Sequence, residues 1–369
     1  MKTTPIKSAA NLLRVTAILG LVLLAPACKT QRANDLPQPG SAASLNIALK
    51  NTIDDIIIPA ITGFKTEATS LQDTAATFCG AASPANLSAL QAQWRQLSLQ
   101  WNRIVIYNFG PLNDDLIFPK INFIESMRQN GTDYTNTVRG ELAARLGDTT
   151  TLDPTYFDSL SFTKTGMLAL EVLIFEDSNG THSTDPADVL ANYQSNSRKC
   201  EYLLGMSRLL VRHADYVEHG WDTEYLNTGK PFRDILLDGE LEDGSEPVPA
   251  LITAIQQHLD YVKKRKLEGI LDAQIADYFY PRLLATLDAI ETLLDGIDDH
   301  YSFFDHMNSS GYQDAVDTVR AGIAGARQFA TNQDRSNLAA AVGSLDGNFK
   351  REIPDSLNVT LGINFSDGD

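Results

Sequence analysis

One carboxylate stands in the middle of an apolar run, and its position gives it a chemical role. Residues 167–175 are apolar at every position except Glu171. A helix that is apolar all round is buried, so Glu171 is predicted to lie inside the protein. An ionised carboxylate there costs on the order of several kcal/mol unless it is paired or hydrogen-bonded. We therefore expect it to contact an arginine or a ligand. The alternative is a buried ion pair that only fixes the register of the helix.

Three arginines lie in helical segments from which they can reach Glu171. Arg95 and Arg103 lie beside a helical stripe that contains Trp94, and Arg212 lies in a later helical segment. Trp94 and Trp101, seven residues apart, share one helix face, and tryptophans at that spacing usually pack in a core. The alternative is that Trp94 belongs to the ligand-binding site. The basic run of residues 263–266 is expected to lie on a solvated helix end.

The residues around Glu171 resemble a known motif. Residues 166–171, Gly-Met-Leu-Ala-Leu-Glu, are similar to the Gly-x-His-x-x-Glu motif of the imelysin family. That family consists mostly of lipid-anchored or periplasmic bacterial proteins, linked to iron uptake and also classed as metallopeptidases. The resemblance implies a site that includes Gly166 and Glu171. Leu168 occupies the position of the motif histidine, and leucine has no lone pair. We therefore predict that the motif does not hold Zn²⁺ or Fe²⁺ tightly and that the protein has no peptidase activity.

Further blocks extend the resemblance, in order, over nearly all of the mature chain. They are residues 94–119, similar to a Trp-rich helix with a Phe-Gly-Pro turn; residues 203–221, similar to a long helix ending in Trp; and residues 353–369, similar to the family's C-terminal ending. The resemblance implies two related four-helix bundles with the functional site where they meet. It also places Gly110 and Pro111 of the turn, and the terminal Asp367 and Asp369, among the expected site residues.

The N-terminus has the pattern of a lipoprotein signal peptide, predicted to span residues 1–27. A basic segment precedes an apolar stretch too short to cross a bilayer, and small residues come directly before Cys28. We expect Cys28 to be lipidated; ordinary cleavage near Ala27 is the alternative. Residues 28–43 are rich in Pro, Gly, Ser and Ala and are expected to form a flexible tether. Lys29 after the cysteine favours an outer-membrane location facing the periplasm.

Two cysteines remain once Cys28 carries the lipid. In an oxidising compartment, Cys79 and Cys200 are a candidate disulfide pair. Two free thiols are the alternative, because the sequence does not give the distance between them.

Helical spacing of apolar residues predicts an all-α fold. Apolar residues recur every three or four positions, for example from Leu87 to Ile104. Residues 222–249 are rich in Gly, Pro and acidic side chains and are expected to be a linker. We predict two antiparallel helix bundles, an N-terminal one over residues 44–221 and a C-terminal one with a tail over residues 250–369. The site is expected at their interface.

Composition excludes several functions. The formal net charge is −17 and no extended basic patch is visible, so nucleic acid is not an expected partner. The His-Glu-x-x-His zinc motif, a nucleophile elbow and a phosphate-binding loop are all missing from the sequence. Whether the protein is an enzyme stays open, and the missing motif histidine favours a protein without enzymatic activity.

Three interpretations of function remain. The first is an imelysin-like binding lipoprotein in bacterial iron acquisition, with a site around Glu171. The second is a metallopeptidase of the imelysin class, and the third is a structural or partner-docking lipoprotein without a small ligand. The expected partners are the membrane, through the lipid anchor, and iron-uptake proteins of the envelope. Iron or another metal is the candidate cofactor, at a site that the sequence does not identify.

Overall fold

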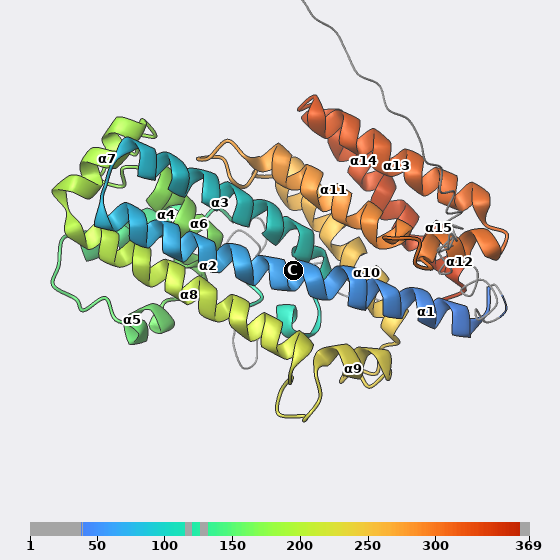
Figure 1. The fold of residues 1–369 in the computed structure, drawn as a ribbon. Helices are drawn as coiled ribbons and strands as arrows, with labels where there is room; N and C mark the ends of the chain where they lie inside the picture. Colours follow the sequence, from blue (N-terminus) through green and yellow to red (C-terminus); the bar gives the residue numbers. More distant parts are fainter. Residues whose placement is uncertain (1–37, 39, 115–119, 126–131, 362–369) are drawn as a thin grey trace, which may run out of the picture. The chain divides into compact units, whose positions relative to one another are not determined.

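Helices make up all the regular structure that the computed structural model describes. It describes residues 38, 40–114, 120–125 and 132–361, and no strand occurs in these ranges. The predicted all-α fold is therefore confirmed for this part of the chain (Figure 1).

Fifteen α-helices follow one another along the described residues, with short 3-10 and π-helical segments between some of them. They are α1 (Ala42–Thr52), α2 (Ile58–Gly80), α3 (Pro84–Ile104), α4 (Thr135–Leu146), α5 (Pro154–Ser159), α6 (Gly166–Phe175), α7 (Pro186–Ser195), α8 (Ser197–Asp222), α9 (Phe232–Leu237), α10 (Pro247–Tyr261), α11 (Phe279–Asp295), α12 (Phe303–Ser309), α13 (Gln313–Thr331), α14 (Arg335–Lys350) and α15 (Glu352–Leu357). The π-helical segments are Ile53–Ile57 and Val262–Leu267.

Helix α2 packs against both α3 and α8, and α6 packs against α3, α4, α7 and α8. The apolar stripe predicted from Leu87 to Ile104 is buried along its whole length in α3. Helices α3, α7 and α8 begin at a side-chain cap. Ser83 accepts a hydrogen bond from the Asn86 amide at the start of α3, and Asp185 does the same for Ala187 at the start of α7. The apolar spacing explains why α3 forms a helix, and the side-chain caps explain where α3 and α7 begin.

A second set of helices consists of α10, α11, α13 and α14, and α11 packs directly on α3 of the first set. The expected linker at residues 222–249 contains α9, which packs on α8 and α1. The described residues from position 38 onward form one compact unit. The division of that unit into two domains, at the boundaries given above, stays a prediction.

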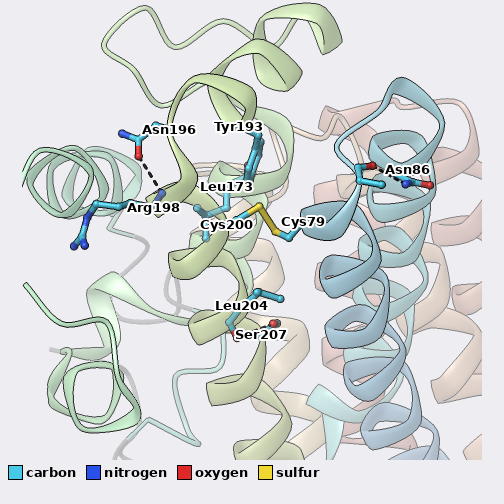
Figure 2. Close-up of a disulfide and its surroundings, with 10 residues drawn as sticks. Cys79, Asn86, Leu173, Tyr193, Asn196, Arg198, Cys200, Leu204 and Ser207 are labelled. Atoms are coloured by element: carbon cyan, nitrogen blue, oxygen red, sulfur yellow. Dashed lines mark hydrogen bonds between the residues drawn. A yellow bond between two sulfur atoms is a disulfide. The ribbon is translucent and has the colours of Figure 1, made fainter.

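A disulfide joins Cys79, near the end of α2, to Cys200, in the first turn of α8 (Figure 2). The two Cα atoms are 5.6 Å apart, and 121 residues of chain separate them. The structure thus has the pair rather than the two free thiols.

Several expectations fall on residues outside the described ranges. These are the signal peptide, the lipidation of Cys28, and the site roles of Asp367 and Asp369. Within the described helices, none is both long enough and apolar enough to cross a bilayer.

Candidate functional site

Helix α6 is buried along its entire length, as its composition predicts. Every residue from Gly166 to Phe175 is buried, and Glu171 is only 2% exposed. Gly166 has a positive φ of 79°, and a Cβ on it would lie 2.0 Å from the carbonyl oxygen of Ile124. The Met167 amide donates a hydrogen bond to that same oxygen at 2.9 Å. The glycine therefore allows α6 to start against the chain at Ile124, which is a structural role.

Glu171 lies in the wall of a small pocket of about 130 Å³. Its Oε1 accepts a hydrogen bond from the backbone N–H of Ala276 at 2.9 Å. Leu168, one helical turn earlier, lines the same pocket, so the two motif positions do share one face. Burial raises the pKa of Glu171 to about 8, although the positive charge of Arg282 and the hydrogen bond from Ala276 act against that rise.

Behind Glu171 lies a buried cluster of four ionised side chains, and each of the four is at most 5% exposed. Arg282 of α11 contacts Glu125 at 2.5 Å and Asp272 at 2.7 Å. Lys266 contacts Asp272 at 2.8 Å and Glu125 at 3.4 Å. The indole Nε1 of Trp101 donates to Glu125 at 3.3 Å. Each cation thus lies between the same two carboxylates.

The two carboxyl groups of this cluster differ in pKa. For Glu125, burial favours the neutral form, but Arg282 and Lys266 outweigh it and hold the pKa well below its usual range. For Asp272, burial prevails over the attraction of Arg282 and raises the pKa to about 6. Glu125 is therefore the firmly ionised partner of the two cations.

The structure corrects the expected arginine partners of Glu171. Arg95 lies over the rings of Phe175 and Tyr278, at 5.0 and 5.7 Å from their centroids. Arg103 donates to Gln100, and Arg212 forms an ion pair with Asp158 at 2.5 Å. None of the three pairs with Glu171, because each has closer partners on its own side of the fold. Arg282 acts on Glu171 through its charge.

Lys266 and Arg282 were not predicted from the sequence as part of this site. Lys266 is 4% exposed, so the expectation that the whole basic run lies on a solvated helix end was wrong for this residue. It lies in the π-helical segment Val262–Leu267, whose extra residue per turn shifts the face on which side chains emerge. For Arg282 a signal existed, since it is four residues before the buried Thr286 on the inner face of α11.

The other expected site residues lie elsewhere. Trp94 is fully buried, with its ring edge on Phe175 at 5.2 Å, so it supports α6 from α3. Phe109 of the Phe-Gly-Pro turn packs on Trp221 and Phe232, at 5.7 and 5.9 Å between ring centroids. Gly110 has a φ of 56°, and a Cβ there would lie 2.4 Å from the Phe232 ring. Pro111 is buried against the end of α8. This turn is an aromatic packing site, and neither Gly110 nor Pro111 lines the Glu171 pocket.

The groups around Glu171 do not fit a transition metal. Leu168 provides no ligand atom, one oxygen of Glu171 is occupied by Ala276, and the raised pKa favours the protonated carboxyl. Transition metals prefer deprotonated carboxylate, imidazole or thiolate ligands. Across the described ranges, no group of three or more His, Cys, Asp or Glu side chains is arranged to hold a metal ion.

Comparison with known proteins agrees with this architecture. The chain matches the family model described as Imelysin over residues 57–356. Because this span covers most of the chain, the protein belongs to the imelysin family. No curated protein matches the chain.

Two solved structures share the fold. An imelysin-like protein from Psychrobacter arcticum 273-4 has a TM-score of 0.63 and 18% identity, covering 88% of this chain and 98% of its own. A protein from Parabacteroides distasonis ATCC 8503, described as a "putative iron-regulated protein A precursor", has a TM-score of 0.59 and 12% identity, covering 88% and 99%. At these identities the likeness establishes the fold.

Proposed function

We propose that this chain is an imelysin-like binding lipoprotein of the cell envelope that acts in bacterial iron acquisition, with its binding site around Glu171. The observation that carries the proposal is the pocket itself, because its wall contains a buried glutamate that has no ion-pair partner among the described residues. Burying such a group costs stability, and perturbed groups of this kind cluster at functional sites. Membership of the imelysin family and the iron-regulated neighbour support the link to iron.

The proposed location is the outer membrane, facing the periplasm, with Cys28 as the lipid-bearing residue. The proposal rests on the signal pattern and the tether in the sequence. The Cys79–Cys200 disulfide supports an oxidising compartment. The proposed partners are the membrane, through the anchor, and iron-uptake proteins of the envelope.

Two other functions compete with this one. A metallopeptidase of the imelysin class needs a metal and an activated water, and the Glu171 pocket lacks the ligands for that metal. A purely structural or partner-docking lipoprotein needs no pocket at all. The pocket around Glu171 therefore favours binding over both.

The test is growth of the source bacterium on a medium made iron-poor with a chelator. We expect deletion of the gene to slow growth there and not in iron-rich medium. The parent gene should restore growth, and Glu171→Ala should not. Asp222→Ala, which removes an exposed carboxylate outside the pocket, is the matched control and should restore growth fully.

Anchoring is tested in the same strains. Cys28→Ser should move the protein from the membrane fraction to the soluble fraction. Growth that does not depend on the gene in iron-poor medium would contradict the proposed function, and a Cys28→Ser protein that stays in the membrane fraction would contradict the anchor.

A further inference from the structure

The buried charges near Glu171 do not balance if every acid is ionised. Three carboxyl groups and two cations lie together, and all five side chains are at most 5% exposed. Both cations, Lys266 and Arg282, are already shared between Glu125 and Asp272. Glu171 makes no ion pair with a described residue. A buried carboxyl group without a counter-ion keeps its proton, because the charged form is the one that burial penalises.

The oxygen that would carry this proton is Oε2. Oε1 accepts the hydrogen bond from Ala276, and among the described residues no group bonds to Oε2. Glu171 lines the pocket, so a proton on Oε2 is available to a ligand there.

A second donor lines the same pocket. Arg139 of α4 donates from Nε and Nη2 to the carboxylate of Glu176 and from Nη1 to Asn136. Arginine has five N–H groups, so two remain for a ligand. The pocket thus offers hydrogen-bond donors from Glu171 and Arg139.

We infer that Glu171 acts as a neutral carboxylic acid that donates a hydrogen bond from Oε2 into the pocket, and that the pocket binds a small oxygen acceptor of the carboxylate or carbonate class rather than a metal cation. This inference rests on the proposed function and names the ligand class of the same site. The pocket has a volume of about 130 Å³, which suits a small ligand. Drug-sized ligands need roughly 300 Å³ or more, so haem and peptides are too large.

Other charged groups face Glu171 and affect both its ionisation and the binding of a ligand. Arg282 attracts its ionised form, and Asp272 and Glu125 repel it. On the pocket side, Asp133 is exposed, and its Oδ1 accepts from the amide and hydroxyl of Thr135. One oxygen of Asp133 is therefore engaged by Thr135. Arg139 is the cation that a bound carboxylate would contact.

The proton makes the binding pH-dependent in a defined direction. The pKa of Glu171 is raised to about 8 by burial. Below that pH, Oε2 donates; above it, the ionised group repels a carboxylate. Affinity for an oxyanion should therefore fall as the pH rises through 8, whereas affinity for a cation would increase.

The test uses the full mature chain and sodium acetate, with sodium bicarbonate as a second probe and ZnCl₂ as the cation. The readout is the amide NMR signal of Ala276, whose N–H contacts Glu171. We expect acetate to shift this signal at pH 6.5 and to bind at least roughly tenfold more weakly at pH 9.5, because little of the acid is then protonated. Glu171→Gln keeps a donor N–H and cannot ionise, so it should bind equally at both pH values. Glu171→Ala should bind at neither.

The contrary outcomes are equally definite. Acetate and bicarbonate that cause no shift, binding that is the same at both pH values in the parent, or Zn²⁺ binding that Glu171→Ala abolishes would each overturn the inference. The growth test separates this inference from the proposed function. Normal iron-poor growth of Glu171→Ala beside clear acetate binding would reject the function and keep the ligand class. Defective iron-poor growth of Glu171→Ala, in the absence of acetate binding by the parent, would keep the function and reject the ligand class.

Discussion

At the scale of single residues, the identity of position 168 decides what chemistry Glu171 can perform. Leu168 and Glu171 line one pocket, but only the glutamate carries a polar atom. The carboxyl group is buried, has no ion-pair partner in the described residues, and has a pKa raised to about 8 by that burial. These properties suit hydrogen-bond donation better than metal coordination.

Leu168→His is predicted to create metal affinity, because it places an imidazole one helical turn from the carboxylate on the same face. Calorimetry with Zn²⁺ at pH 8.5, where Glu171 is largely ionised, should show binding that the parent lacks. Leu168→Phe adds a ring without a lone pair and is the matched control. Submicromolar Zn²⁺ binding by the parent, abolished by Glu171→Ala, would contradict the claim that the motif with Leu168 does not hold a metal tightly.

The sequence predicted some of this residue-scale picture and missed the rest for a physical reason. The burial of Glu171 follows from the apolar residues on both sides of it, which is local information. Its charged surroundings come from Glu125, Lys266, Asp272 and Arg282, which lie far from it along the chain. A π-helical segment turns Lys266 inward, and no periodic spacing in the sequence indicates such a segment.

At the scale of elements, the end of α6 is held by side chains from three other helices. Tyr193 of α7 donates to the Leu173 carbonyl at 2.8 Å, and Gln91 of α3 donates to that of Ile174 at 3.3 Å. Lys199 of α8, which is fully buried, donates to the carbonyls of Glu176 and Asp177, both at 2.8 Å. A cation at a helix C-terminus also complements the helix dipole. These bonds fix the element that carries Glu171.

Lys199→Met should lower the free energy of unfolding by ~1–3 kcal/mol, because it leaves two buried carbonyls without donors. Burial lowers the Lys199 pKa from 10.5 to about 7. A lowered folded-state pKa gives a contribution that is full above pH 10.5 and is lost as the pH falls through 7, so the deficit of the variant should grow from pH 7 to pH 9.5.

Urea unfolding at the two pH values measures that deficit. Lys50→Met, at a side chain 56% exposed, is the control and should change little. A Lys199→Met deficit that shrinks at the higher pH would contradict the lowered pKa of Lys199.

At the scale of the whole molecule, helical spacing in the sequence was sufficient to predict the all-α fold class. It was not sufficient to predict which helices pack together. The stripe from Leu87 to Ile104 predicted a helix, and that face of α3 is buried in the structure. The partner of each helix was not predictable, because helices of similar composition can pack in many orders. The disulfide is the exception, since Cys79 and Cys200 were the only candidates once Cys28 was set aside.

Replacing both Cys79 and Cys200 by serine should lower the free energy of unfolding by ~2–5 kcal/mol, because the bond closes a long loop in the unfolded chain. Thermal melts of the double variant and the parent under oxidising conditions measure the loss. Cys28→Ser keeps the bond and should melt like the parent. Coincident melts of the double variant and the parent would mean that the bond does not form in the native protein.

The most direct test of the central claim is the titration of Glu171 itself. Carbon-13 NMR of the side-chain carboxyl groups, with the Glu171 signal assigned by its disappearance in Glu171→Gln, should give a pKa of about 8 instead of the ordinary value of 4.5. A raised folded-state pKa also means a contribution to stability that is full below pH 4.5 and is lost as the pH rises through 8, so Glu171→Gln should flatten that decline. A Glu171 carboxyl that ionises at or below pH 4.5 would contradict its role as a neutral hydrogen-bond donor.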